Sequence, residues 1–307
     1  MRATPTRHRS EDCELHGGRL MIPSGHRAQH GSAATWFDSS LVRWERRLLE
    51  ICVFVGPTRL KKIPDRAHIF APAALGSVFR AVQAGYKLIC IIDGHFGNMP
   101  SVWHKEILFA LKSGAVVCGS SSMGALRAAE LHAFGMVGFG FVYRAFRRGA
   151  LQDDDEVCVL HAVPELHFGA LSEAMVNIRY SLREMRHRAL IDRKSEVSIT
   201  SSLKALHFSK RTLAAVQSAF EQTFGTEAAA KFDLYERTKV DIKAMDAELM
   251  LSTVSSSPVI SKSHTWTFPA TNHWLQQFLA QHSDIPPIRR WHPTSERSHE
   301  LNPLASR

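Results

Sequence analysis

Hydrophobic and polar positions between about residues 50 and 165 follow two alternating patterns. Short apolar runs rich in β-branched side chains are typical of buried strands, and apolar positions recurring about every three to four residues are typical of helices. Their alternation predicts an α/β fold with an open, mostly parallel, Rossmann-like sheet of four or five strands and helices on both faces. Strands are predicted at 51–56, 67–72, 87–94, 115–119 and 156–162, and helices at 75–85, 100–114 and 123–135.

From about residue 170 onward the apolar spacing is helical throughout. Leu, Phe and Met recur at helical intervals, which indicates faces that pack into a core. This part of the chain is therefore predicted to form a helical subdomain that packs on the α/β core. Its helices are expected within 171–190, 212–225, 227–252 and 272–282.

The two ends of the chain have a different composition from the rest. Residues 1–46 are rich in Arg, His, Ser and Gly, and residues 283–307 are rich in Pro and polar side chains. Such segments bury too little apolar surface to fold, so both are predicted to be flexible tails. Met21 is a possible alternative initiator. The α/β core is then assigned to 47–195 and the helical subdomain to 196–282.

Composition and charge narrow the class of protein. The chain of 307 residues is 45% hydrophobic and 22% charged, which is ordinary for a soluble globular protein. It has neither an apolar run long enough to span a membrane nor a secretory signal pattern, so a cytoplasmic location without a membrane partner is expected. The net charge of +9 permits an acidic partner. The basic residues are spread along the chain, which favours a solvated basic surface over nucleic-acid binding.

The five cysteines do not form a Cys-x-x-Cys pair. Cys52, Cys90 and Cys118 lie inside apolar runs predicted to be strands. They are expected to behave as small buried hydrophobic residues in a reducing compartment, and the position of Cys118 argues against a nucleophilic role.

A run of serines separates a predicted strand from a predicted helix in "GSSSMGALRAAEL", residues 119–131. Ser122 would lie at the start of the helix, where the backbone N–H groups of Met123 and Gly124 can donate to an oxyanion. The spacing Gly-x-x-Ser-x-Gly resembles the nucleophile elbow, whose usual form is Gly-x-Ser-x-Gly. Two interpretations remain: Ser122 is a nucleophile, or the serines cap the helix and bind an anion.

A nucleophilic serine needs a base, and "WHKE" offers two candidates at the start of the helix predicted at 100–114. His104 lies at the margin of the apolar face, and its unperturbed pKa near 6.5 suits a base. Lys105 would need its pKa lowered by roughly three units, about 4 kcal/mol, so it ranks second. Lys105 could instead bind an anion, and a surface patch is the alternative for both residues.

Further candidates follow other predicted strands. The carboxyl ends of parallel strands meet at one edge of a sheet, where binding sites form. Gly56 and Pro57 follow the first strand, and Asp93 and Gly94 follow the third. Asp93 could orient His104 or bind substrate, and its alternative role is a turn with Gly94.

The remaining charged motifs give weaker signals. Arg127 could bind substrate, but its spacing from Glu130 favours a structural ion pair. The acidic run 153–156 could hold a metal, although a solvated loop is favoured. The chain lacks a P-loop motif, and no Pro-Cys-x-x-Cys follows His104-x-Glu106 as in zinc deaminases. No metal or cofactor is expected.

Six ordered blocks together resemble the TfuA-like core domain, over about residues 52–190 or roughly half of the chain. "PSVWHKEIL" and "SMGALRAAEL" carry most of the likeness. One departure is "GSSSMG", where the family pattern has alanines before the last serine. The blocks are "VFVGP" (53–57), "IIDGHF" (91–96), "PSVWHKEILFAL" (100–111), "GSSSMGALRAAEL" (119–131), "FGMVGFG" (134–140) and "DDEVCVLHA" (154–162).

The resemblance implies partners and a reaction. TfuA-like proteins accompany YcaO-type enzymes, which use ATP to activate peptide backbone amides, in thioamide installation and trifolitoxin-type peptide biosynthesis. The implied role is sulfur delivery, by cleavage of the thiocarboxylate at the end of a small ThiS-like carrier protein. The implied partners are therefore a YcaO-type enzyme, a ThiS-like carrier and, indirectly, a precursor peptide.

The residues and the resemblance agree on acyl-transfer chemistry. Ser122 would attack the thiocarboxylate carbonyl, and His104 or Lys105 would handle the proton. A second hypothesis is a non-catalytic adaptor that recruits or activates the YcaO partner. A third is a stand-alone serine hydrolase of small esters.

Overall fold

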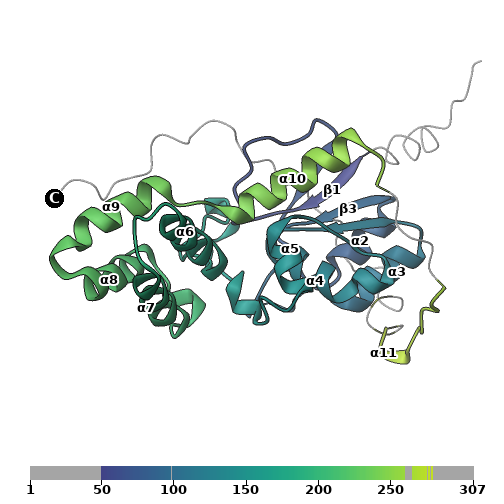
Figure 1. Ribbon diagram of the computed structural model, residues 1–307. Coiled ribbons are helices and arrows are strands. Elements are labelled where there is room, and N and C mark those ends of the chain that lie inside the picture. Colours follow the sequence, from purple (N-terminus) through teal and green to yellow (C-terminus); the bar gives the residue numbers. More distant parts are fainter. Residues whose placement is uncertain (1–49, 98, 260–264, 275, 277, 279–307) are drawn as a thin grey trace, which may run out of the picture. The chain divides into compact units, whose positions relative to one another are not determined.

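A parallel sheet lies at the centre of the computed structural model (Figure 1). Among the described residues it has five strands, in the order β2-β1-β3-β4-β5, and every pairing is parallel. The predicted open α/β fold is thus confirmed. The predicted tails 1–46 and 283–307 lie outside the described residues. The structure describes residues 50–97, 99–259, 265–274, 276 and 278.

The strands are short, and three of the central ones end at the same level. Phe54 of β1 is paired with Ile91 of β3, which is paired with Gly119 of β4. The loops that follow these three residues therefore leave the sheet side by side at its carboxyl edge. The strands are β1 (Ile51–Phe54), β2 (Ala67–Phe70), β3 (Leu88–Ile91), β4 (Val116–Gly119) and β5 (Val137–Gly138).

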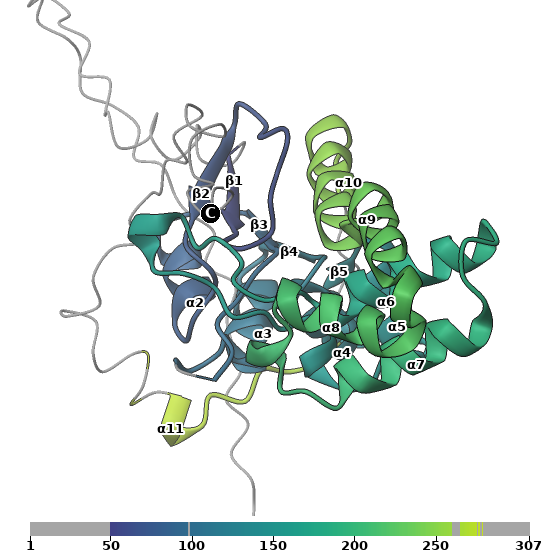
Figure 2. The ribbon, with the colours of Figure 1, turned by 90° about the vertical axis from the view of Figure 1, so that its left-hand side faces the viewer.

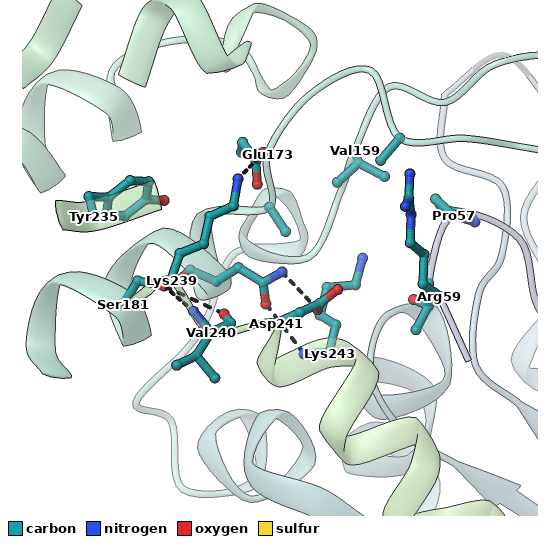
Figure 3. A pocket seen from close by; sticks show the side chains of 14 residues that line it. Pro57, Arg59, Val159, Glu173, Ser181, Tyr235, Lys239, Val240, Asp241 and Lys243 are labelled. Atoms are coloured by element: carbon teal, nitrogen blue, oxygen red, sulfur yellow. Dashed lines mark hydrogen bonds and ion pairs between the residues drawn. The ribbon is translucent and has the colours of Figure 1, made fainter. Parts of the chain in front are cut away.

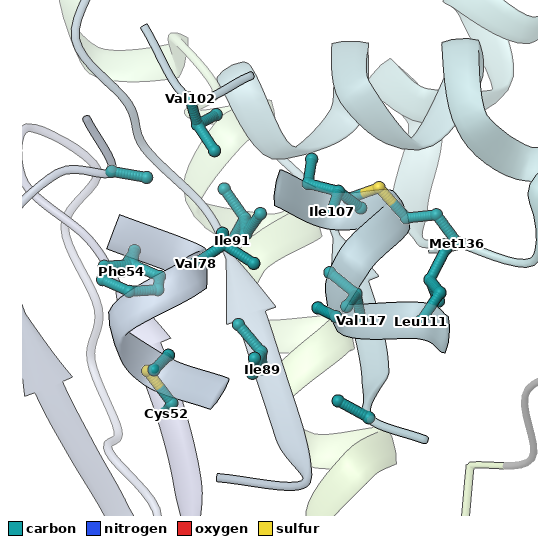
Figure 4. Close-up of a cluster of buried hydrophobic side chains, with 14 of the residues drawn as sticks. Cys52, Phe54, Val78, Ile89, Ile91, Val102, Ile107, Leu111, Val117 and Met136 are labelled. Carbon is teal, nitrogen blue, oxygen red and sulfur yellow. The ribbon is translucent and has the colours of Figure 1, made fainter. Parts of the chain in front are cut away.

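One face of the sheet packs against the helices of the crossover connections (Figure 4). These are α2 (Ser77–Gln83), α3 (His104–Lys112) and the start of α4 (Met123–Leu131). Every second side chain of the strands points toward this face, and these side chains form one buried cluster with the three helices. The cluster includes Cys52, Phe54, Ile89, Ile91, Val117, Val78, Ile107 and Leu111.

The opposite face is covered by a helix from the far end of the described chain (Figure 2). This is α10 (Ile242–Ser256), whose Met250 and Leu251 are buried against Val53, Cys90 and Cys118. The strand cysteines thus pack as hydrophobic residues. Helices lie on both faces, as predicted. The second face is covered by α10, which belongs to the part of the chain predicted to form the helical subdomain.

The segment predicted as one helical stretch, 227–252, is two helices in the structure. α9 (Ala228–Thr238) ends before Asp241, whose carboxylate accepts the Ala244 N–H and caps α10. An Asp at this position favours a new helix start over continuation. α9 shares a separate apolar cluster with α6 (Met175–His187), α7 (Arg193–Lys204) and α8 (Leu213–Phe224).

The predicted strand at 156–162 is wrong. A 3-10 turn, η2 (Asp154–Glu156), precedes an irregular segment, and the fifth strand is instead β5, which is followed by α5 (Gly140–Arg147). The acidic run is solvated only at its start, because Asp153 and Asp154 are exposed whereas Asp155 pairs with the fully buried Arg211. Glu156 pairs with Arg179 and Lys204. These ion pairs connect the segment to α6, α7 and Arg211.

The C-terminal described residues pack on α2 and α3. Trp274 in the short α11 (Asn272–Trp274) and Phe278 form an aromatic cluster with Phe79. Within the helix predicted at 272–282, residues 275, 277 and 279–282 lie outside the described residues. Within the described part of the chain, every helix is too short or too polar to cross a membrane.

Candidate functional site

The turn between β4 and α4 is strained and buried. Ser120, Ser121 and Ser122 are all buried, and Ser121 has a φ of 68°, in the left-handed region that side chains rarely adopt. The Ser120 N–H donates to the Ile91 carbonyl at 3.1 Å, which ties the turn to β3. The predicted strand–serine–helix arrangement is therefore present, and its strained residue is Ser121.

Two glycines let α4 begin directly against the sheet. A Cβ on Gly124 would lie 1.7 Å from the Ile91 carbonyl oxygen, and one on Gly119 would lie 2.1 Å from the Gly124 oxygen. The Gly124 N–H donates to the Ile92 carbonyl at 3.2 Å, so it is not free for an oxyanion. The Met123 N–H has no acceptor among the described residues. Of the two N–H groups predicted to stabilise an oxyanion, only that of Met123 has no acceptor among the described residues.

The three serine hydroxyls have three different environments. Ser122 Oγ donates to the Val157 carbonyl at 3.3 Å and does not cap the helix. Ser121 Oγ lies 3.1 Å from Thr58 Oγ1. Ser120 Oγ is buried and has no partner within the described residues. The hydroxyls are therefore chemically distinct, and single substitutions can separate their roles.

Asp93 organises the loop after β1. Its carboxylate accepts the N–H groups of Gly56 and Thr58, both at 2.9 Å, and the Thr58 hydroxyl at 2.8 Å. Through Thr58 it also reaches Ser121. The structure thus joins Asp93 to the serine turn, whereas no hydrogen bond joins it to His104 among the described residues.

The glycines after β1 and β3 permit close packing at the same edge. A Cβ on Gly56 would lie 2.3 Å from the Pro72 ring, and one on Gly94 would lie 2.7 Å from the Met123 side chain. Gly94 therefore adjoins the start of α4. Pro57 contributes to the wall of a cavity described below.

His104 lies away from Ser122. Its Nε2 is 2.7 Å from a Glu130 carboxylate oxygen, and its side chain is 48% exposed. Glu130 also pairs with Arg127 at 2.8 Å, which is the ion pair that the spacing predicted. Glu130 lies eight residues beyond Ser122, about 12 Å along the axis of α4. The structure therefore does not bring His104 to the serine.

Lys105 is engaged by the C-terminal segment. Its Nζ donates to Thr271 Oγ1 at 2.9 Å and lies 5.6 Å from the centroid of the Phe268 ring. These contacts place the amine on the outer side of α3. Neither base predicted from the sequence hydrogen-bonds to the serine turn within the described residues.

Glu106, the last residue of "WHKE", has a structural role that the sequence reasoning did not assign. Its carboxylate accepts N–H groups of Val78, Phe79 and Trp103 at the starts of α2 and α3. Burial raises the pKa of Glu106 to about 7, although these hydrogen bonds act in the opposite direction. A glutamate three residues after a helix start is a capping signal, and it could have been found.

Lys243 is the titratable side chain that the structure connects to Ser122. Its Nζ donates to the Val157 carbonyl at 3.0 Å, the same oxygen that accepts from Ser122 Oγ. Lys243 is 3% exposed, and it has no ion pair among the described residues. It lies in α10, far along the chain from the serine turn, so no local sequence signal links the two.

A cavity of about 420 Å³ opens beside this group (Figure 3). Two of its lining residues are linked to the serine turn by hydrogen bonds. Thr58 bonds directly to Ser121, and Lys243 donates to the same Val157 oxygen as Ser122. The cavity thus lies where ligands bind in open parallel sheets. It is lined by Pro57, Thr58, Arg59, Val159, Ala170, Glu173, Ala174, Asn177, Ser181, Tyr235, Lys239, Val240, Asp241 and Lys243.

Comparison with known proteins supports a family assignment for part of the chain. No curated protein matches the sequence. Residues 93–212 match the family model described as TfuA-like protein. The matched segment starts at Asp93, includes the serine turn and ends after α7, whereas the resemblance was predicted over about 52–190. The protein therefore carries a TfuA-like domain over residues 93–212.

Proposed function

We propose that this protein releases sulfide from a thiocarboxylated ThiS-like carrier protein for a YcaO-type enzyme that modifies peptide backbones. TfuA-like proteins are associated with YcaO partners in peptide modification. The observation that carries the proposal is the pairing of Ser122 Oγ and Lys243 Nζ on one backbone oxygen, beside the start of α4. A serine and an amine held together at a helix N-terminus suit acyl transfer.

The reaction needs a serine nucleophile and a path for one proton. Ser122 Oγ attacks the carbonyl carbon of the thiocarboxylate, the C–S bond breaks, and a serine ester forms. The serine proton ends on the departing sulfur, which leaves as hydrosulfide. Lys243 carries this proton, in the role that the sequence suggested for His104 or Lys105. Water then hydrolyses the ester, which yields the carrier carboxylate and a proton and regenerates the serine.

The tetrahedral intermediate carries its negative charge next to α4. The Met123 N–H, which has no acceptor among the described residues, and the positive end of the helix dipole stabilise that charge. Ser122 is 3% exposed, so the substrate carbonyl has to displace Val157 from the serine. When the substrate carbonyl oxygen replaces the Val157 oxygen, the Ser122 hydroxyl and the Lys243 amine both keep a hydrogen-bond acceptor.

The TfuA-like resemblance implies the carrier protein as the substrate, and the net charge of the chain is consistent with it. The net charge of +9 suits an acidic carrier, which gains from electrostatic complementarity. A tail that ends in Gly-Gly has no side chains to obstruct its approach to the buried Ser122. The released sulfide would pass to the YcaO partner, so the precursor peptide is reached only indirectly.

The test is intact-protein mass spectrometry of a thiocarboxylated carrier incubated with the wild type, Ser122→Ala and Ser120→Ala. We expect the wild type and Ser120→Ala to convert thiocarboxylate to carboxylate with release of sulfide. Ser122→Ala should lose at least about 10³-fold in rate, as removal of a nucleophile does in serine hydrolases. Equal conversion by Ser122→Ala would exclude the serine as the nucleophile.

A second function is favoured by the burial of Ser122 and its bond to a backbone carbonyl. In that case the serine is structural, and the protein is an adaptor that recruits or activates the YcaO enzyme. The two functions differ in one measurement. The adaptor predicts that the carrier survives incubation with this protein, while the YcaO reaction is stimulated equally by the wild type and Ser122→Ala.

A further inference from the structure

We propose that a pocket between α6 and α7 binds a phosphate-bearing anion through its arginine side chains. The pocket has a volume of about 430 Å³, and it is lined by Arg179, Arg183 and Arg186 of α6 and by Arg193 of α7. It shares no lining residue with the cavity beside Lys243, and its residues have no part in the release of sulfide. The proposal therefore goes beyond the function proposed above and stands without it.

The fold gathers arginines that the sequence spreads over two helices. Arg179, Arg183 and Arg186 are spaced i, i+4 and i+7, which places them on one face of α6. α7 packs beside α6 through a shared apolar cluster and adds Arg193, its first residue (Figure 1). Among the described residues that line the pocket, Glu196 is the one acidic side chain. Like charges at this helical spacing repel one another, so an anion between them stabilises the arrangement.

Ion pairs hold two of the arginines in place. Arg186 donates from Nε to the Glu196 carboxylate, a contact that joins α6 to α7. Arg179 donates from Nε and Nη2 to the two oxygens of Glu156, at 2.9 Å and 3.0 Å. The Arg179 and Arg186 side chains are 37% and 30% exposed, so water reaches only part of each. A guanidinium group has five N–H donors, and these pairs leave some of them for a ligand.

The other two arginines are available to an anion that enters the pocket. Arg183 and Arg193 are exposed, and neither forms an ion pair with another described residue. An arginine presents planar pairs of N–H donors that match two oxygens of a phosphate group. The cations among the described lining residues are all arginines, which favours a phosphate group over a non-specific counter-ion.

The rest of the lining has room for an organic group on the phosphate. Thr200 and Ser201 add two hydroxyl groups from α7. Val197, one turn before Ser201, is 51% exposed and gives the pocket an apolar surface. The volume falls within the range of pockets that bind small organic ligands. Because the chain lacks a P-loop, side chains would supply the phosphate contacts that a glycine-rich loop supplies in such proteins.

The test is isothermal titration calorimetry of the full-length protein at about 0.15 M salt, where exposed charges are largely screened. The probes are inorganic phosphate, pyrophosphate, ADP and a short peptide of Asp and Glu residues. We expect pyrophosphate and ADP to bind at least about tenfold more tightly than the acidic peptide, because guanidinium groups pair bidentately with phosphate oxygens. Tighter binding of ADP than of pyrophosphate assigns the site to a phosphorylated organic molecule, and equal binding assigns it to a free phosphate or polyphosphate.

Matched variants separate the pocket from the general charge of the surface. Arg183→Gln and Arg193→Gln remove guanidinium groups without breaking an ion pair between described residues, and each should weaken pyrophosphate binding about tenfold. Arg188→Gln and Lys194→Gln remove exposed cations beside the same helices but outside the pocket, and each should change binding by less than about twofold. Circular dichroism of every variant shows whether the fold is intact.

Three results would overturn the proposal. The first is the absence of binding of pyrophosphate and ADP at millimolar concentration. The second is binding of the acidic peptide that is as tight as that of either, which would make the pocket part of a protein interface. The third is an equal loss in Arg193→Gln and Lys194→Gln, which would show an effect of net charge alone. Sulfide release does not enter these measurements, so a result for Ser122→Ala neither supports nor weakens the phosphate site.

Discussion

Glu106 gives the sharpest quantitative prediction for the fold around the site. Its carboxylate is buried between the starts of α2 and α3 and accepts three backbone N–H groups. Burial raises its pKa from 4.5 to about 7. Glu106→Gln removes the ionisation while keeping one carbonyl acceptor and nearly the same shape.

The sign of the pH effect follows from proton binding. Between about pH 4.5 and pH 7 the folded state holds the Glu106 proton more tightly than the unfolded state does. The free energy of unfolding therefore falls as pH rises through this window and levels off above it. A pKa difference of about 2.5 corresponds to a loss of about 3 kcal/mol. The free energy of unfolding of the glutamine variant does not fall in this way, because glutamine does not ionise.

The assay is urea unfolding followed by circular dichroism, at about pH 5 and about pH 8. Other groups titrate in the same range, so the informative quantity is the difference between wild type and Glu106→Gln at each pH. We expect that difference to shift by about 2.5 kcal/mol in favour of the variant at the higher pH, because part of the unfolded-state carboxyl is already ionised at pH 5. Glu248→Gln, which removes a partly exposed carboxylate from α10, is the control. A shift below about 0.5 kcal/mol would refute the reasoning.

Three further predictions concern the turn and the ion-pair network. Gly124→Ala forces a Cβ against the Ile91 carbonyl and should destabilise the fold by at least about 1–3 kcal/mol in thermal unfolding. Gly169→Ala should be near neutral, because its Cβ would make only a van der Waals contact, 3.5 Å from the Leu166 oxygen. Ser121→Gly and Ser121→Ala both lose the hydroxyl, but only glycine relieves the φ of 68°, so the glycine variant should be more stable by about 1 kcal/mol. Equal stability would argue against strain. Arg211→Met leaves Asp155 without its buried partner and should cost about 3–5 kcal/mol, against under about 1 kcal/mol for Arg237→Met in an exposed pair.

The periodicity of the sequence predicts the sheet well because burial follows local pattern. The strands at β1, β3 and β4 are apolar runs buried on both faces, and the helices between them have clear start and stop signals. The segment 156–162 has the same apolar, β-branched character, yet it does not join the sheet. Its preceding acidic residues pair with Arg211, Lys204 and Arg179, and no local pattern reveals such distant pairs.

The part of the site formed by residues adjacent in sequence was also predictable from local pattern. The strand-to-helix turn at Ser122 follows from residues adjacent in sequence. His104 and Lys105 begin a helix at the correct edge of the sheet, but their side chains turn outward to Glu130 and Thr271. Lys243 comes from a helix whose packing on the far face of the sheet depends on the whole fold.

The central claim is that Ser122 forms a covalent ester with the carrier tail. The most direct measurement is mass spectrometry of the protein, acid-quenched shortly after mixing with thiocarboxylated carrier, followed by peptide mapping. The account predicts an acyl adduct on the peptide that contains residues 113–127, assigned to Ser122 and absent from Ser122→Ala. Hydrolysis of the carrier at a normal rate with the adduct on another residue, or with no adduct in rapid-quench samples of a single turnover, would contradict it.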